Sequence, residues 1–230
     1  MTTTTTTTLT RAAGVAAVVG GLLFIGLQIK HPHVDATFAT TTEFTVRESL
    51  KVLMAALSFV GITGMYLRQV RQAGVLGLIG YVLFGAGWLA LMSVEVVGVS
   101  IIPSLAHTAP RYVNDVLAVA NGGTATGDIG LFTTVNTVTG IAYLGGGLIF
   151  GIALFRANVL ARWAAVLLSV AAVATIGTKM LPHVNERVFA LPVGAAMVCL
   201  GYSLWRDQRT PAAQTAPNAV GSHLDPAGAR

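Results

Sequence analysis

Long apolar stretches alternate with shorter polar segments along the chain. A helix rises about 1.5 Å per residue, so about 20 largely apolar residues cross the roughly 30 Å hydrocarbon core of a membrane. Val and Ile inside the stretches do not indicate strands, because the runs are too long and unalternating for a barrel and an unpaired strand edge is prohibitive in lipid. The pattern predicts six transmembrane helices, at Ala12–Ile29, Leu50–Leu67, Ala73–Val99, Ile129–Phe155, Trp163–Met180 and Val188–Trp205.

The composition also favours a membrane-embedded chain. Of the 230 residues, 54% are hydrophobic and only 10% are charged, whereas a soluble domain carries roughly a quarter charged residues. The same values exclude a disordered chain. The single cysteine, Cys199, lies in an apolar run and excludes an internal disulfide framework. We therefore expect an all-α polytopic membrane helix bundle.

Polar segments separate the helices and flank the bundle. The interruptions at Gln69–Gln72 and Arg156–Arg162 are short and contain arginine, and longer polar stretches run from Lys30 to Ser49 and from Pro103 to Asp128. The composition of both chain ends is typical of unstructured segments. We expect a disordered N-terminal threonine tract at 1–10, a six-helix membrane domain at 11–206 and a disordered tail at 207–230.

The basic residues predict an orientation, because cytoplasmic loops retain Lys and Arg. The two short loops are purely basic, whereas Lys and Arg in the longer segments are mixed with acidic residues. The N- and C-termini are therefore expected to be cytoplasmic. The net charge of +5 then reflects topology and not nucleic-acid binding, since the chain has no run of Lys and Arg and no basic helix face.

A cleaved signal peptide is the alternative interpretation of the first apolar stretch. That stretch is longer than a usual signal-peptide core, and only Arg11 supplies a positive charge before it. Ala36–Ala39 has the small residues of a loose cleavage site. The lengths favour retention of the stretch as a transmembrane helix.

Several short motifs resemble those of a known family. Arg11–Gly14 opens the first helix, Gly151–Arg156 leads to Leu160–Trp163, and Val166–Leu168 follows. Together they resemble an uncharacterised family of six-helix bacterial integral membrane proteins, which is described only as a domain of unknown function. The resemblance covers most of the chain and implies a bacterial origin and a place in the cytoplasmic (inner) membrane. It implies no active residues.

Two glycine patterns predict close helix packing. Gly147-x-x-x-Gly151 has the spacing at which small residues let two membrane helices approach closely. Gly74, Gly77 and Gly80 are spaced by three, and we interpret them as a packing stripe on the third helix.

Three strongly polar side chains inside the predicted spans are candidate site residues, because such groups are costly in lipid unless paired or hydrated. Glu95 lies about 33 Å along the third helix and shares a face with Trp88, Met92 and Gly98. Asn136 lies near the start of the fourth helix and Lys179 near the end of the fifth. All three fall in the outer third of the membrane. We predict an outward-facing polar pocket formed by Glu95, Asn136 and Lys179.

A simpler interpretation of the same residues remains open. Lys179 can extend to the outer headgroups, Glu95 can be hydrated at the interface, and the nearby threonines can bond to their own backbone. Charges close to the interface cost much less than charges at the midplane. The sequence alone does not show whether these helices are neighbours.

Histidines are the other unusual feature. Four lie in outer segments (His31, His33, His107 and His183), and His223 lies in the tail. Imidazole nitrogens are common ligands of zinc and copper. The spacings match no zinc signature, however, so we predict no metal site.

The absence of catalytic motifs shapes the functional hypothesis. The sequence contains no Walker loop, no Gly-x-Ser-x-Gly elbow and no His-Glu-x-x-His motif. We predict no catalytic residue and no cofactor, and favour a transporter-like or membrane-sensing or partner protein. The alternative is a membrane enzyme acting on lipid or quinone, including a metal-dependent one. The expected partners are the lipid bilayer and a second copy or another membrane protein, and not nucleic acid.

Overall fold

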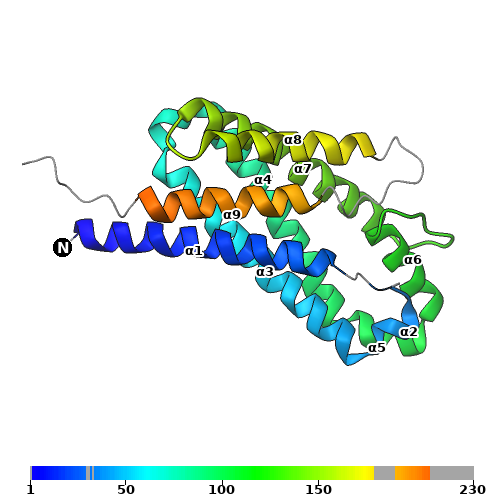
Figure 1. The fold of residues 1–230 in the computed structure, drawn as a ribbon. Coiled ribbons are helices and arrows are strands. Elements are labelled where there is room, and N and C mark those ends of the chain that lie inside the picture. Colours follow the sequence, from blue (N-terminus) through cyan, green and yellow to red (C-terminus); the bar gives the residue numbers. More distant parts are fainter. Residues whose placement is uncertain (1, 30–31, 33, 179–189, 208–230) are drawn as a thin grey trace, which may run out of the picture.

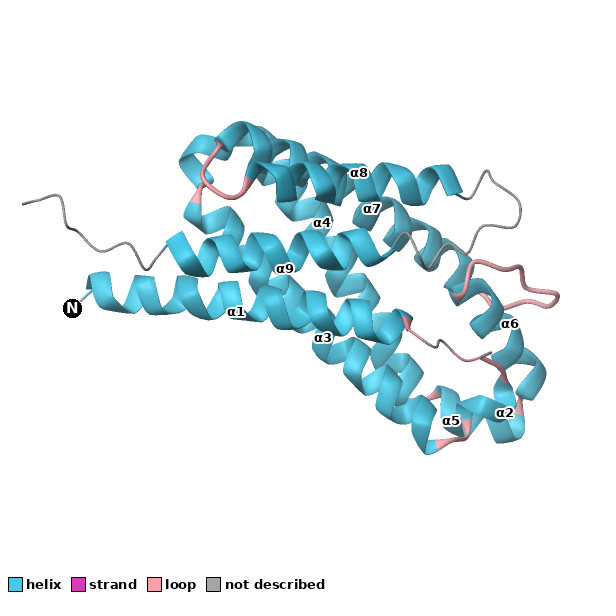
Figure 2. Ribbon diagram, viewed as in Figure 1, coloured by secondary structure: helices cyan, strands magenta, loops and turns pink. Residues whose placement is uncertain are grey.

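Helices make up almost all of the described structure. The computed structural model describes residues 2–29, 32, 34–178 and 190–207, and these contain helices and no strand (Figure 2). The helices are α1 (Thr2–Gln28), α2 (Ala36–Ala39), α3 (Thr42–Arg68), α4 (Val70–Ser100), α5 (Ile102–Thr108), α6 (Pro110–Ala120), α7 (Phe132–Ala157), α8 (Arg162–Thr178) and α9 (Ala190–Asp207). The prediction of an all-α fold is confirmed.

The long helices coincide with the predicted apolar stretches. In the described part of the chain, four helices are long and apolar enough to cross a membrane, at Thr6–Gln28, Thr42–Arg68, Val70–Ser100 and Phe132–Ala157. Helices α8 and α9 are shorter, with 17 and 18 residues. The four long spans indicate a membrane protein.

The long helices form a closed ring in chain order (Figure 1). Helix α1 packs against α3 and α9, α4 lies between α3 and α7, and α8 lies between α7 and α9. The start of α1 and the end of α9 lie at the same end of the ring (Figure 1). There the Arg11 guanidinium lies 5.9 Å from the centre of the Trp205 ring. The tight connections α3–α4 and α7–α8 are also at this end (Figure 1).

Glycines allow neighbouring helices to approach closely. A Cβ at Gly80 of α4 would lie 2.5 Å from the backbone nitrogen of Phe150 on α7, and a Cβ at Gly14 of α1 would lie 2.8 Å from the carbonyl oxygen of Gly201 on α9. The predicted packing role of Gly151 is confirmed, since a Cβ there would lie 2.8 Å from the carbonyl oxygen of Ala165 on α8. Such contacts stabilise membrane bundles through dispersion.

Gly74 does not belong to a packing stripe. It has no neighbour within 4 Å of an added Cβ, and its φ of +56° and ψ of −153° interrupt α4. This is a region that residues with side chains rarely adopt. Gly74 therefore shapes the turn that follows Gln69, whereas Gly80 makes the close helix contact.

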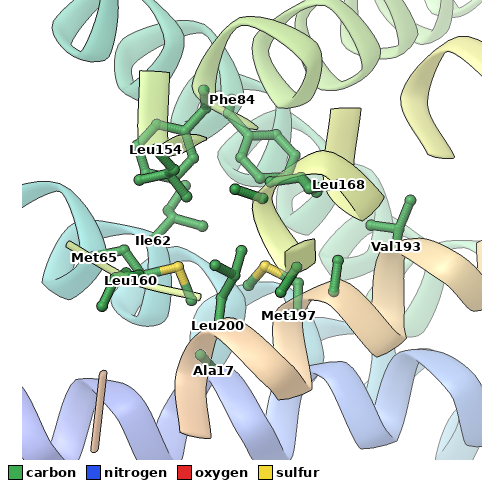
Figure 3. Close-up of a cluster of buried hydrophobic side chains, with 14 of the residues drawn as sticks. Ala17, Ile62, Met65, Phe84, Leu154, Leu160, Leu168, Val193, Met197 and Leu200 are labelled. Atoms are coloured by element: carbon green, nitrogen blue, oxygen red, sulfur yellow. The ribbon is translucent and has the colours of Figure 1, made fainter. Parts of the chain in front are cut away.

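Apolar side chains from all six long helices fill the middle of the ring (Figure 3). They include Ile62 and Met65 of α3, Phe84 of α4, Leu154 of α7, Leu168 of α8, and Met197 and Leu200 of α9. Many large apolar residues face outward instead, such as Val75, Ile141 and Val170, which are 73%, 67% and 56% exposed. An apolar exterior around a packed core is what a lipid environment requires.

The two long polar segments are folded and are not simple connections. They contain α2, the first turns of α3, α5 and α6, which gather at the end of the ring away from the start of α1 and the end of α9 (Figure 1). We call these elements together the cap. They share a second apolar core, whose buried residues are Ala36, Ala39, Phe44, Ile102, Ala106, Val113, Val116, Leu117, Val119 and Ile129. The cap could not be predicted from the apolar stretches, because each of its helical segments is short and mixes polar with apolar positions.

The threonine tract also differs from expectation. Helix α1 begins at Thr2, so residues 2–10 are helical where disorder was predicted. The hydroxyl of Thr10 donates to the carbonyl of Thr6, which is how a threonine satisfies its polar group within a helix. The predicted tail begins at Asp207, the last residue of α9, and the rest of it lies outside the described residues.

Candidate functional site

The start of α3 brings two charged side chains to the junction between the cap and the ring. Thr41 begins the helix, with its hydroxyl oxygen accepting a hydrogen bond from the amide of Phe44 at 3.2 Å, which is a typical N-cap. Because the helix starts this early, Glu48 and Lys51 stand one turn apart on the same face. Helix α4 runs alongside and contributes Glu95.

These three residues form a carboxylate–ammonium cluster. The Nζ atom of Lys51 donates to Glu48 Oε1 at 2.6 Å and lies 3.4 Å from Glu95 Oε2. The side chains of Glu48, Glu95 and Lys51 are 9%, 13% and 25% exposed. One ammonium thus serves two largely buried carboxylates on different helices.

Glycine again makes the approach possible. A Cβ at Gly98 would lie 2.9 Å from Glu48 Oε2, so the backbone of α4 lies directly against this carboxylate. A small enclosed void of about 10 Å³ borders the cluster, which is about the space that one water molecule needs. Its lining combines cap and ring residues: Leu27, Pro32, Val34, Phe38, Phe44, Arg47, Glu48 and Lys51.

The charges of the cluster do not balance. With both carboxylates ionised, it carries one more negative than positive charge. Isolated charges in a poorly hydrated environment are expensive, and removal of one partner exposes that cost. Such a cluster within helices that can cross a membrane is a candidate functional site, and its excess charge suits a cation or a proton.

Glu95 is the predicted site residue that enters this cluster. The helix face that Glu95 shares with Trp88 and Met92 points inward, since Trp88 is 1% exposed and Met92 packs against the core. The cationic partner of Glu95 in the described structure is Lys51. Lys179, predicted to fill that role, lies outside the described residues.

The described partner of Asn136 is a backbone carbonyl of α6. Its side-chain amide donates to the carbonyl oxygen of Val119 at 3.1 Å, which ties the start of α7 to the end of α6. The described hydrogen bonds therefore give Asn136 a role in holding the cap to the ring. It is not bonded to Glu95 within the described part of the chain.

The sequence analysis missed Glu48 because this residue lies in the polar segment that precedes Leu50, which was interpreted as a connection. It missed Lys51 because this residue is the second of the predicted helix Leu50–Leu67, at its outer end. A local signal was present. Thr41 is a good capping residue, and Glu43 and Arg47 have the spacing of a helical ion pair, with Arg47 Nε 2.8 Å from Glu43 Oε1. These features predict a helix that begins well before the apolar stretch.

Polar contacts hold the elements of the cap together. The Asp115 carboxylate of α6 accepts hydrogen bonds from the backbone amides of Thr126 and Gly127 at 2.9 and 3.0 Å and from the hydroxyl of Thr126. The hydrogen bond from the backbone amide of Thr126 is the main reason that the pKa of Asp115 lies below its usual range. Asn114 Oδ1 accepts from the amide of Ala36 at 2.7 Å and so joins α6 to α2.

Most of the histidines lie outside the described residues. This holds for His31, His33, His183 and His223, whereas His107 lies in α5. Among the residues that the structure describes, no three side chains of His, Cys, Asp or Glu are grouped as metal ligands.

The chain has no match in three comparisons with known proteins. No protein-family model matches it, and neither a curated protein nor a solved structure does. The evidence on function therefore comes from the residues of the site itself.

Proposed function

We propose that the chain is a six-span protein of the bacterial inner membrane with both termini in the cytoplasm, a member of the uncharacterised family it resembles. In this proposal it acts as a transporter-like or membrane-sensing protein. Its functional centre is the carboxylate–ammonium cluster, which faces outward beneath the cap and binds a cation or a proton.

The position of the basic residues supports the orientation. Arg68 and Arg71 flank one tight connection, and Arg156 and Arg162 flank the other, at the end of the ring where α1 starts and α9 ends (Figure 1). Basic residues in short loops favour the cytoplasmic side. The cap then lies on the outer side.

The observation that carries the proposed site is the excess negative charge of the cluster. A structural ion pair needs one carboxylate for each ammonium, whereas here Glu48 and Glu95 share Lys51. The second carboxylate lies in a largely buried position, where an unpaired charge is costly. Binding of a cation or proton from the outer side removes this cost.

Cysteine labelling tests the topology. Cys199 is the sole cysteine of the chain, so a Cys199→Ala protein accepts single new cysteines at exposed Gln72, in the first turn of α4, and at exposed Thr124, beside the cap. In intact bacterial cells, we expect a membrane-impermeant maleimide to label Thr124→Cys. Gln72→Cys should be labelled only after permeabilisation. Labelling of Gln72→Cys in intact cells would overturn the orientation.

Ligand-induced stabilisation tests the site. The thermal unfolding midpoint of the purified full-length protein is measured with added sodium, potassium, magnesium or ethanolammonium chloride. A ligand that binds only the folded state adds about 2.7 kcal/mol when its concentration is about 100-fold above its Kd. We expect one of these cations to raise the midpoint of the wild type more than that of Glu95→Gln, which loses the excess charge.

The same measurement separates the outcomes. Equal shifts in both proteins for all four cations would contradict a cation site at the cluster. If one cation stabilises the wild type more than Glu95→Gln, its uptake into proteoliposomes distinguishes a transporter-like protein from a sensing one.

A further inference from the structure

An apolar groove runs between α1 and α3 on the outside of the ring. It has a volume of about 640 Å³ and is lined by Val19, Leu22, Leu23, Gly26, Leu27, Thr42, Glu43, Val46, Arg47 and Leu50. Both helices are long and apolar enough to cross a membrane. The groove is therefore bordered by lipid and not by water along most of its length.

The polar groups of the groove lie at one end. Thr42, Glu43 and Arg47 belong to the first turns of α3, on the cap side, whereas the lining residues of α1 are all apolar or glycine. The ion pair between Arg47 and Glu43 is 58% exposed on the glutamate side and offers both a cation and an anion. The groove thus has the polarity of an amphiphile, with a long apolar part and a short charged end.

We propose that this groove binds one acyl chain of a zwitterionic phospholipid from the leaflet on the cap side. The chain lies along Val19, Leu22 and Leu23, and the headgroup lies at the ion pair. Arginine pairs well with phosphate oxygens and a carboxylate with a primary ammonium, so Arg47 and Glu43 match the two charges of an ethanolamine-type headgroup.

The site is distinct from the carboxylate–ammonium cluster, although Arg47 borders both the groove and the small void beside Lys51. The inference depends on α1 and α3 lying in a membrane and not on what Glu95 binds. Its failure would leave the proposed cation site untouched, and the reverse also holds.

Gly26 provides a direct way to fill the groove. It lines the groove, and a Cβ there meets no atom within 4 Å, so Gly26→Leu introduces a side chain into open space. Gly145 of α7 is a matched control, because a Cβ there also meets no atom and it does not line the groove. Both changes replace a helical glycine by a better helix former, so both proteins are expected to fold.

The experiment is native mass spectrometry of the full-length protein taken from nanodiscs that contain phosphatidylethanolamine and phosphatidylglycerol. We expect the wild type and Gly145→Leu to retain one phosphatidylethanolamine. Gly26→Leu should lose at least about tenfold in retained lipid, which corresponds to about 1.4 kcal/mol of binding free energy. Glu95→Gln should retain the lipid as the wild type does.

Three results would overturn the proposal. Equal retention by Gly26→Leu and Gly145→Leu would mean that the groove holds no specific lipid. Preferential retention of phosphatidylglycerol would contradict the zwitterionic headgroup. Loss of a dimer in Gly26→Leu but not in Gly145→Leu, with lipid retention unchanged, would assign the groove to a second copy of the chain.

Discussion

Replacement of Lys51 by methionine is expected to lower the free energy of unfolding by about 3 kcal/mol, because breaking a buried ion pair leaves an uncompensated charge. Here the loss of one ammonium leaves the two carboxylates of Glu48 and Glu95 without a cationic partner among the described residues. Methionine keeps most of the length and apolar surface of the lysine stem, so the effect reports the charge. The measurement is unfolding of the purified protein in mixed micelles with increasing denaturing detergent.

Two comparisons make this prediction specific. Glu95→Gln should cost less than Lys51→Met, since the 2.6 Å pair between Glu48 and Lys51 remains. Adding Glu95→Gln to Lys51→Met should recover part of the loss, because one of the two uncompensated charges is removed. Equal and additive effects of the two changes would show that the three groups are not coupled.

Arg47 serves as a control for the position of the charge. Its partner Glu43 is 58% exposed, and exposed ion pairs contribute about 0–1 kcal/mol. Arg47→Met should therefore change the free energy of unfolding much less than Lys51→Met does. A similar loss in both variants would mean that burial does not set the cost.

Replacement of Gly146 by alanine is expected to destabilise the protein by about 2–3 kcal/mol, the upper part of the usual range for overpacking a tight core. A Cβ at Gly146 of α7 would overlap the backbone of Leu83 and Phe84 on α4, with the Leu83 carbonyl carbon at 2.7 Å. Backbone atoms cannot rotate away as a side chain can. The two helices must therefore separate, and dispersion contacts along the interface weaken.

The neighbouring glycine is the control for this change. A Cβ at Gly145 meets nothing within 4 Å, so Gly145→Ala should leave stability unchanged or raise it by up to about 1 kcal/mol through helix propensity. The two variants differ by one position on the same helix. If both had the same effect on the unfolding transition, the close α4–α7 contact would not be responsible.

The long helices of the described structure coincide with the predicted stretches because each contains a continuous apolar run, and four of them are long and apolar enough to cross a membrane. The second stretch, Leu50–Leu67, ends within one residue of the end of α3 at Arg68. Its start is wrong by two turns, because the first turns of α3 are polar on their outer face and pack only one residue in three or four against the cap. A helix is easiest to predict from sequence where all of its faces are apolar, because the apolar run is then unbroken.

The site was only partly predictable for a related reason. Glu95 stands out as a charge in an apolar run, but its partner Lys51 is 44 residues away in sequence. Only the adjacency of α3 and α4 brings them together. Glu48 lies in a segment whose sequence is polar and resembles a loop, whereas in the structure this residue is buried next to the core of the cap. Such a core forms from four separate segments, and no single one of them is apolar enough to reveal it.

The closed ring has a consequence for the order in which the chain is made. Each long helix except α1 packs against the long helix that precedes it in sequence. One packing partner has therefore already been synthesised when such a helix leaves the ribosome. Helix α1 can pack against α3 early, but its other neighbour, α9, is the last of the described helices to be synthesised. The surface around Gly14 and Gly21 of α1, which α9 covers, therefore stays without its final partner throughout translation. Packing of α9 against α1 is the step that closes the ring.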